Sequence, residues 1–222
     1  MQEKSLDARL DSIHQALDRE HRLVMGTPQA DYTRYRGYPL EAQKYLARAA
    51  RKYLPASSVS FDLGCGIGAW TQFAAAAGLN SYGIDINDFL LSKARTLAEE
   101  SKIRGDIPRD SVCKFALGNF HHGGNESQYI IHARSSKSDG IMPAIFRDNP
   151  YNKLGISLKD ADVIYSFVWP EHSISLCTLL AQETKKSALF VLPLRLAECQ
   201  SILPLRVLEN VPGKGTALYR RS

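Results

Sequence analysis

The chain has 222 residues and a formal net charge of +5, and 44% of its residues are hydrophobic and 23% are charged. This length and composition are typical of a soluble globular protein with one sizeable domain. No apolar run approaches the roughly 18–20 residues of a membrane-spanning helix, and the first residues lack the apolar stretch of a secretory signal. We therefore expect a cytoplasmic protein. Its four cysteines are scattered without a CxxC pair, which favours reduced thiols.

Residues 1–54 are predicted to form an N-terminal helical segment that packs on the core or covers its site. Apolar residues recur at helical spacing over residues 4–23, and a second amphipathic helix precedes residue 54. Between the two helices, residues 31–39 (DYTRYRGYP) hold three tyrosines and two arginines and are typical of a loop. These side chains could line a substrate pocket, or their rings could simply pack on the domain.

The stretch from Val59 to Trp70 (VSFDLGCGIGAW) joins a short apolar run to three glycines at every second position. An alanine-rich, helix-prone run follows over residues 71–77. A strand, a tight turn and a helix in this order predict the entrance to a nucleotide-binding βαβ unit. Glycine adopts backbone angles that are closed to other residues, and without a Cβ it lets a ligand lie against the main chain. The N-terminus of the helix adds unpaired N–H groups and a partial positive charge.

The glycine spacing fits two cofactor fingerprints. Gly64, Gly66 and Ala69 match the G-x-G-x-x-A form of dinucleotide-binding proteins. Gly64, Gly66 and Gly68, with Asp62 two residues before them, closely resemble the first motif of the class I S-adenosylmethionine (SAM)-dependent methyltransferases. The resemblance extends from Val59 towards the C-terminus and implies SAM as the cofactor. The candidate cofactor-binding residues in this stretch are Asp62, Gly64, Cys65, Gly66, Gly68 and Trp70.

Two further strands are predicted to end in residues that bind the nucleoside. The second strand ends at Asp85 and Ile86, where an acid can accept hydrogen bonds from both ribose hydroxyls. Asn119 and Phe120 follow a third strand over residues 111–117. The resemblance implies that a polar residue at the position of Asn119 meets the amino group of adenine, although many family members have Asp there. An Asn selected only for a turn is the alternative.

Residues 120–158 are longer than a usual connection and are predicted to be an insertion beside the cofactor site. Their pattern resembles a β-hairpin with a polar tip. His121 and His122 are adjacent, and no acidic or thiol partner stands at metal-ligand spacing, so no metal site is expected.

A fourth strand over residues 162–167 leads to the candidate catalytic residues. Ligands bind at the carboxyl ends of strands in such sheets, and the resemblance implies that the next segment faces the transferred methyl group. Ser166 is therefore a cofactor candidate, and the catalytic candidates are Trp169, Glu171 and His172. His172 is the best base candidate because its unperturbed pKa is about 6.5, and Glu171 is the alternative. Pro and Glu in this segment also suit a first helical turn, so a purely structural role stays open. The segment departs from the family's Asp/Asn-Pro-Pro-Tyr form, which counts against bases and glutamine as acceptors.

The last third of the chain predicts the rest of the sheet. A helix over residues 173–185 precedes an apolar fifth strand over residues 188–192, and residues 206–211 and 216–220 are predicted to pair as a hairpin. The resemblance implies that one strand of this pair is antiparallel. We expect an α/β fold with a doubly wound, mostly parallel, Rossmann-like sheet of about seven strands, with the core spanning residues 55–222.

The positive charge lies towards the C-terminus, where residues 185–222 contain seven Lys or Arg and two Asp or Glu. Such a region could attract a nucleic-acid or protein acceptor, but it is more often a solvated face. The tyrosines of residues 31–39 and Trp169 slightly favour a small, flat or apolar acceptor. The predicted function is methyl transfer from SAM to an unidentified acceptor. One alternative is a non-catalytic SAM- or nucleotide-binding protein or a regulatory protein. The other is an NAD(P)-linked oxidoreductase, against which Asp62 and the terminal hairpin count. The oligomeric state is not indicated.

Overall fold

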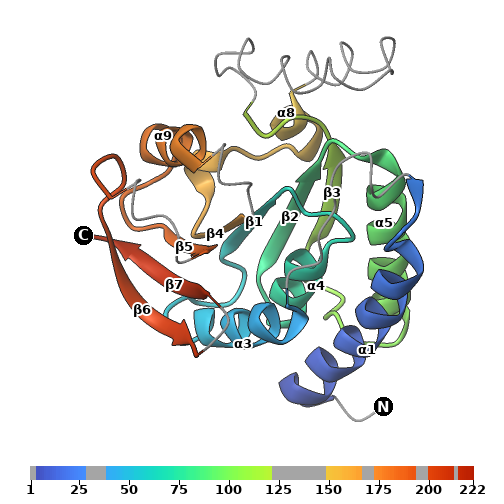
Figure 1. Ribbon diagram of the computed structural model, residues 1–222. Helices are drawn as coiled ribbons and strands as arrows, with labels where there is room; N and C mark the ends of the chain where they lie inside the picture. The colour runs from blue at the N-terminus through green and yellow to red at the C-terminus, as the bar shows by residue number, and fades with distance from the viewer. Residues whose placement is uncertain (1–3, 29–38, 122–148, 167–172, 194–199, 213–214) are drawn as a thin grey trace.

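The computed structural model describes residues 4–28, 39–121, 149–166, 173–193, 200–212 and 215–222 (Figure 1). Within these residues, one seven-stranded sheet has the order β3-β2-β1-β4-β5-β7-β6. β1 to β5 are parallel, and β7 runs antiparallel to both of its neighbours. The strands are β1 (Val59–Leu63), β2 (Asn80–Asp85), β3 (Cys113–Leu117), β4 (Val163–Ser166), β5 (Leu189–Pro193), β6 (Leu205–Val211) and β7 (Thr216–Arg221).

Helices cover both faces of this sheet (Figure 1). They are α1 (Leu6–Val24), α3 (Leu40–Ala50), α4 (Ala69–Ala76), α5 (Asp88–Ile103), α8 (Pro150–Leu154), the short 3₁₀ helix η1 (Leu158–Asp160) and α9 (Ser173–Glu183). The helices α1, α3, α4 and α5 share one apolar cluster with one face, and α8, η1 and α9 share a second cluster with the other. Tyr165 and Val191 point into the first cluster while Ile164 and Phe190 point into the second, as the two-residue period of a strand requires.

The N-terminal helices pack on the face of the sheet that α4 and α5 also cover. The side chain of Ser5 caps α1 by accepting a hydrogen bond from the backbone N–H of Ala8. The predicted apolar stripe of α1 is buried, with Ile13 and Leu17 fully inaccessible. Ion pairs along α1 and α3, such as the one between Asp11 and Lys44, tie the two helices together. The N-terminal segment therefore contributes to the same core as the glycine-rich stretch.

The predicted α/β fold with its antiparallel C-terminal hairpin is confirmed. The main differences are at strand ends. β2 spans Asn80–Asp85, so Ile86 lies just beyond it. β3 begins at Cys113, later than predicted, and the N–H of Val112 donates instead to the side chain of Asn80.

The predicted hairpin within residues 120–158 lies outside the described residues, and the described end of that segment forms α8 and the start of η1. Among the helices that the structure describes, none is both long and apolar enough to span a membrane.

Candidate functional site

The carboxyl ends of four parallel strands lie at one edge of the sheet, where the described candidates at the strand ends also lie (Figure 1). The last residue of β1 pairs in register with the last residue of β4, and the last residue of β2 pairs with the last residue of β3. Residues 64–68, here called the glycine turn, directly follow β1, and Asn119 lies just beyond β3. Ligands of doubly wound sheets bind at this edge.

The glycine turn has a backbone that only glycine adopts easily. Gly64, Gly66 and Gly68 have φ angles of 82°, 54° and 75°, all in the left-handed region. Gly64 is exposed, whereas every other residue from 60 to 77 is buried. The turn therefore presents bare main chain to solvent at the edge of the sheet, which is the feature that a cofactor lying against the backbone requires.

Asp85 connects the end of β2 to the glycine turn. Its Oδ2 accepts a hydrogen bond from the N–H of Gly66 at 2.7 Å, and its Oδ1 accepts one from the N–H of Asn87 at 2.8 Å. Burial raises the pKa of Asp85, and the backbone N–H bonds oppose this effect in part. Each carboxylate oxygen has a second lone pair, so ribose hydroxyls remain possible donors. The structure thus adds a backbone-holding role to the predicted ligand role.

Asp62 performs a capping task that α4 cannot perform for itself. The N-cap residue of α4 is Gly68, which has no side chain to cap the helix. Oδ2 of Asp62 instead accepts hydrogen bonds from the N–H of Thr71 at 3.1 Å and from its hydroxyl at 2.8 Å. Oδ1 of Asp62 is buried and has no donor within the described part of the chain. Burial raises the pKa of Asp62 to about 7, although the bonds from Thr71 counteract it.

Trp70 and Ser166 are fully buried beside the site. The indole N–H of Trp70 donates to Ser60 Oγ at 2.9 Å, and its ring stacks on Tyr165 with centroids 5.2 Å apart. The hydroxyl of Ser166 donates to the carbonyl of Leu63 at 3.0 Å. Both side chains therefore bond to residues of β1, and their predicted contact with a cofactor stays a prediction.

Cys65 and Ile86 differ in how far they reach the surface. The thiol of Cys65 is buried, and burial raises its pKa well above the ordinary value. The raised pKa makes the thiol a poor nucleophile. Because the side chain is buried, we expect its predicted contact with a cofactor to come from its backbone. Ile86 is half-buried directly after β2, where an apolar contact with a bound nucleoside stays a prediction.

Asn119 and Phe120 form a turn at the end of β3. Oδ1 of Asn119 accepts a hydrogen bond from the N–H of His121 at 3.0 Å, so the turn role considered for this residue is present. The carbonyl of Phe120 accepts a bond from the hydroxyl of Tyr151 at 2.8 Å, which ties the turn to α8. The amide NH₂ group of Asn119 has no partner among the residues that the structure describes, and its contact with a base stays a prediction.

Gly83 packs closely behind the glycine turn and was not among the residues predicted from the sequence. A Cβ on Gly83 would lie 2.7 Å from the Phe115 ring, 2.8 Å from Thr71 Oγ1 and 2.9 Å from Cys65 Sγ. Strand β2 thus passes directly against the glycine turn and the start of α4. A glycine inside a strand is the sequence signal for such close approach.

The catalytic candidates Trp169, Glu171 and His172 lie outside the described residues, as do His122 and most of the loop over residues 31–39. β4 ends at the candidate edge, and α9 begins at Ser173. Their catalytic roles stay predictions. In the described ranges, no group of three His, Cys, Asp or Glu residues could hold a metal ion.

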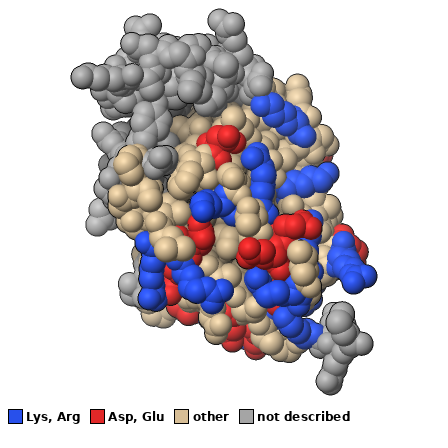
Figure 2. Space-filling model, turned by 90° about the vertical axis from the view of Figure 1, so that its right-hand side faces the viewer, with Lys and Arg blue, Asp and Glu red and all other residues tan. Residues whose placement is uncertain are grey.

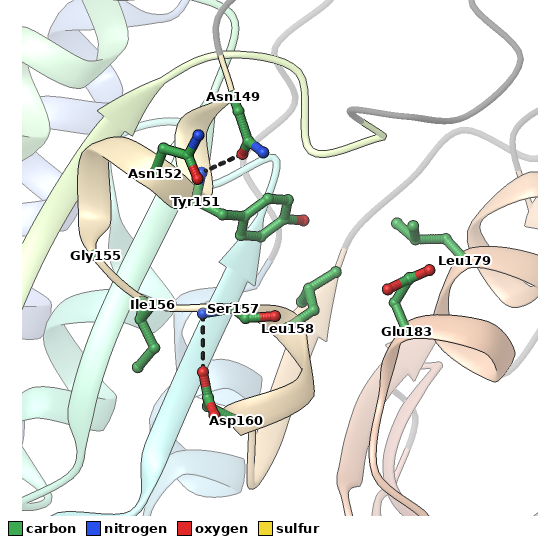
Figure 3. A pocket seen from close by; sticks show the side chains of 10 residues that line it. All are labelled: Asn149, Tyr151, Asn152, Gly155, Ile156, Ser157, Leu158, Asp160, Leu179 and Glu183. Atoms are coloured by element: carbon green, nitrogen blue, oxygen red, sulfur yellow. Dashed lines mark hydrogen bonds between the residues drawn. The ribbon is translucent and has the colours of Figure 1, made fainter.

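A hollow of about 630 Å³ lies between α8, η1 and α9, on the face of the sheet opposite α4 (Figure 3). The side chain of Asn149 accepts from the N–H of Tyr151, and Asp160 accepts from the N–H of Ser157. These polar groups cap neighbouring helices, and none of the lining residues is a predicted site residue. The lining residues are Asn149, Tyr151, Asn152, Gly155, Ile156, Ser157, Leu158, Asp160, Leu179 and Glu183.

Charges of both signs are interspersed on the face that α1 and α5 form (Figure 2). Two cations in the described part of the basic C-terminal region bond to other elements of the fold. Lys185 Nζ lies 2.5 Å from Asp162 Oδ1, and Arg221 donates to the carbonyls of Leu180 and Ala181 at the end of α9.

No family model matches this sequence, and no curated protein matches it. A ribosomal protein L11 methylase from Lactobacillus delbrueckii subsp. bulgaricus is structurally similar, with 15% identity over 85% of this chain and 81% of that chain, and a TM-score of 0.53. A TehB-like SAM-dependent methyltransferase from Corynebacterium glutamicum has 12% identity over 94% and 98% of the chains, with a TM-score of 0.49. An RNA methyltransferase from Salinibacter ruber, solved with S-adenosyl-L-homocysteine, has 19% identity over 81% and 86%, with a TM-score of 0.48.

The similarity to the L11 methylase agrees with the sheet described above. The chain has the Rossmann-like fold of the class I methyltransferases, with a mixed seven-stranded sheet and a C-terminal antiparallel hairpin.

Proposed function

We propose that this chain is a SAM-dependent methyltransferase. The observation that carries the proposal is the glycine turn, in which three left-handed glycines expose main chain at Gly64 beside the acid that ends β2. The antiparallel β7 between β5 and β6 supports SAM over a dinucleotide, because dinucleotide-binding sheets have the order 3-2-1-4-5-6.

The residues around the glycine turn fit the chemical groups of SAM. Asp62 offers a buried oxygen that lacks a donor among the described residues, and the amino acid part of SAM carries an ammonium group. Asp85 retains lone pairs for the ribose hydroxyls. The amide NH₂ group of Asn119 has no partner among the described residues, and adenine ring nitrogens accept hydrogen bonds. Pairing with an ammonium group would lower the pKa of Asp62, so we expect binding to release a proton near neutral pH.

When bound, SAM supplies a methyl group that its sulfonium charge already activates. The tasks left to the protein are to bind, to exclude water and to hold the acceptor in line with the bond that breaks, and positioning of this kind can supply much of the rate enhancement. A general base is needed only if the acceptor must lose a proton. We propose His172 as this general base, with Glu171 as the alternative. We propose that Trp169 forms a wall of the acceptor pocket.

We favour a small molecule as the acceptor. A macromolecule rich in phosphate is bound through a broad positive surface. Lys185 and Arg221 are used within the fold, and the face formed by α1 and α5 carries both signs of charge (Figure 2). The internal bonds of Lys185 and Arg221 weaken the case for nucleic-acid binding through the basic C-terminal region, and the mixed charges weaken it for the face that α1 and α5 form.

Titration calorimetry with SAM, S-adenosylhomocysteine and NAD tests the cofactor. We expect the first two to bind and NAD not to bind, whereas tight NAD binding without SAM binding would overturn the proposal. Asp88→Ala is a matched control for Asp85→Ala, because Asp88 is an exposed acid at the start of α5 with a side chain 70% accessible. Affinity should fall in the Asp85 variant alone.

Methyl-labelled SAM, incubated with the metabolite fraction and the macromolecular fraction of a cell extract, tests the reaction and the acceptor. Label in the metabolite fraction supports a small-molecule methyltransferase. Label confined to RNA or protein would contradict the proposed acceptor class. SAM binding without transfer to either fraction would favour the non-catalytic binding protein.

A further inference from the structure

A buried carboxylate anchors α1 at the C-terminal end of α5. Asp106 is fully inaccessible and accepts hydrogen bonds from Lys4 Nζ at 2.6 Å, from Ser12 Oγ at 2.7 Å and from Arg104 Nε at 2.8 Å. Burial acts to raise the pKa of Asp106, but these bonds outweigh it and lower the pKa. The ionised carboxylate therefore holds two side chains of the N-terminal segment against the core.

The hydrogen bonds continue from this anchor into the core. Arg104 Nη2 donates to Ser101 Oγ at 3.0 Å, and Ser101 Oγ donates to Gln72 Oε1 at 3.3 Å. Gln72 Nε2 then donates to the carbonyl of Ile67 at 3.4 Å. Ser101 and Gln72 are both buried, so water does not compete for these groups. The series ends on the main chain of the glycine turn.

The carbonyl of Ile67 belongs to the peptide unit that joins Ile67 to Gly68. The N–H of the same unit donates to the carbonyl of Cys65 at 2.7 Å. Glycines on both sides of Ile67 leave the backbone with more conformational freedom than other residues would allow. A hydrogen bond at each end of the peptide unit therefore fixes its plane.

Three side chains hold the turn and the helix that follows it. Asp85 binds the N–H of Gly66, Asp62 binds Thr71, and Gln72 binds the carbonyl of Ile67. The first two act from the strands of the sheet. The third connects the turn to α1 through Ser101 and the Asp106 anchor.

We propose that Gln72 is a positioning residue. The hydrogen bonds from Asp106 through Arg104, Ser101 and Gln72 to the carbonyl of Ile67, here called the relay, let the docking of α1 at Asp106 preorganise the glycine turn for its cofactor. The identity of the ligand rests on the proposed function. Glutamine suits this position because its carbonyl accepts from Ser101 while its amide donates to Ile67. Preorganisation improves affinity because the bound conformation no longer has to be ordered at the moment of binding.

Two core variants and one matched pair test the relay. Gln72→Met keeps a similar shape without either hydrogen bond, and Ser101→Ala removes the middle link. Asp106→Asn weakens the anchor, and Asp11→Asn is its control. Asp11 Oδ1 also joins α1 to another helix, because it lies 3.1 Å from Lys44 Nζ of α3, but it stands outside the relay and its side chain is 61% exposed. Ser12→Ala, which removes a single bond to Asp106, replaces Asp106→Asn if that variant does not fold.

The first readout is amide hydrogen exchange of residues 64–68 in the ligand-free chain, with the amides of β2 as the internal reference. The second is the dissociation constant for SAM. We expect Gln72→Met and Ser101→Ala to speed exchange in the turn relative to β2 and to weaken SAM binding by about two- to thirty-fold. Asp106→Asn should act in the same direction, and Asp11→Asn should change neither readout.

Unchanged exchange and affinity in both Gln72→Met and Ser101→Ala would overturn the relay. Equal effects of Asp106→Asn and Asp11→Asn would also overturn it, because α1 would then act only through general stability. If the wild-type chain does not bind SAM, the proposed function fails, and the exchange measurements still decide whether the relay exists.

Discussion

Replacing Gly68 by alanine probes how tightly the glycine turn packs on β3. Gly68 has a φ of +75°, and an added Cβ would lie 2.6 Å and 2.8 Å from two atoms of the Phe115 ring. Gly78 has a φ of +84°, yet a Cβ there would meet nothing within 4 Å. Gly78→Ala is therefore a matched control, which carries the same backbone strain without the steric clash.

The two variants differ by the cost of the clash. A left-handed conformation costs a residue with a Cβ about 1–2 kcal/mol. Overpacking a filled core adds about 1–3 kcal/mol. We expect Gly78→Ala to lower the free energy of unfolding by about 1–2 kcal/mol, and Gly68→Ala to lower it by about 2–5 kcal/mol.

Urea denaturation of the wild type and both variants measures these free energies. Phe115→Leu replaces the ring that the new methyl group meets by a smaller aliphatic side chain. The double variant Gly68→Ala with Phe115→Leu should therefore lose less stability than the sum of the single changes. Equal losses for Gly68→Ala and Gly78→Ala would refute the reasoning, because they would mean that the Phe115 ring moves aside without cost.

Three aspartates give further predictions. Burial raises the pKa of Asp62 from 3.8 to about 7, so the wild type should lose stability relative to Asp62→Asn as the pH rises through this range, by at most about 4 kcal/mol. The pKa of Asp106 is lowered, so the stability of the wild type relative to Asp106→Asn should be lost as the pH falls. Urea titrations at acidic and at mildly alkaline pH measure the difference in unfolding free energy for each pair. Changes of the same sign with pH for the Asp62 and Asp106 pairs would contradict the assignments. Asp85→Ala leaves the N–H groups of Gly66 and Asn87 unpaired and should cost about 1–3 kcal/mol of stability, with weaker SAM binding by calorimetry; an unchanged affinity would remove Asp85 from the site.

The sequence by itself determined the order and the type of the strands and helices. Hydrophobic periodicity acts over a few neighbouring residues, so it predicted α1, the apolar β5 and the C-terminal hairpin with small errors at their ends. The glycine spacing was equally informative, because a turn with three left-handed residues restricts the residue type at each position. Together they placed Asp85 and Asn119 at the edge of the sheet that forms the candidate site.

The tertiary structure decided what each polar side chain does there. Asp62 caps a helix from a strand, Trp70 turns into the core against Tyr165, and Gln72 receives a hydrogen bond from a helix that is distant in the sequence. None of these partners stands at a fixed spacing from its residue, because packing of separate elements, and not local backbone geometry, brings them together. The same motif that identified the turn therefore left open how it is held, and the structure assigns that role to Asp62, Asp85 and Gln72.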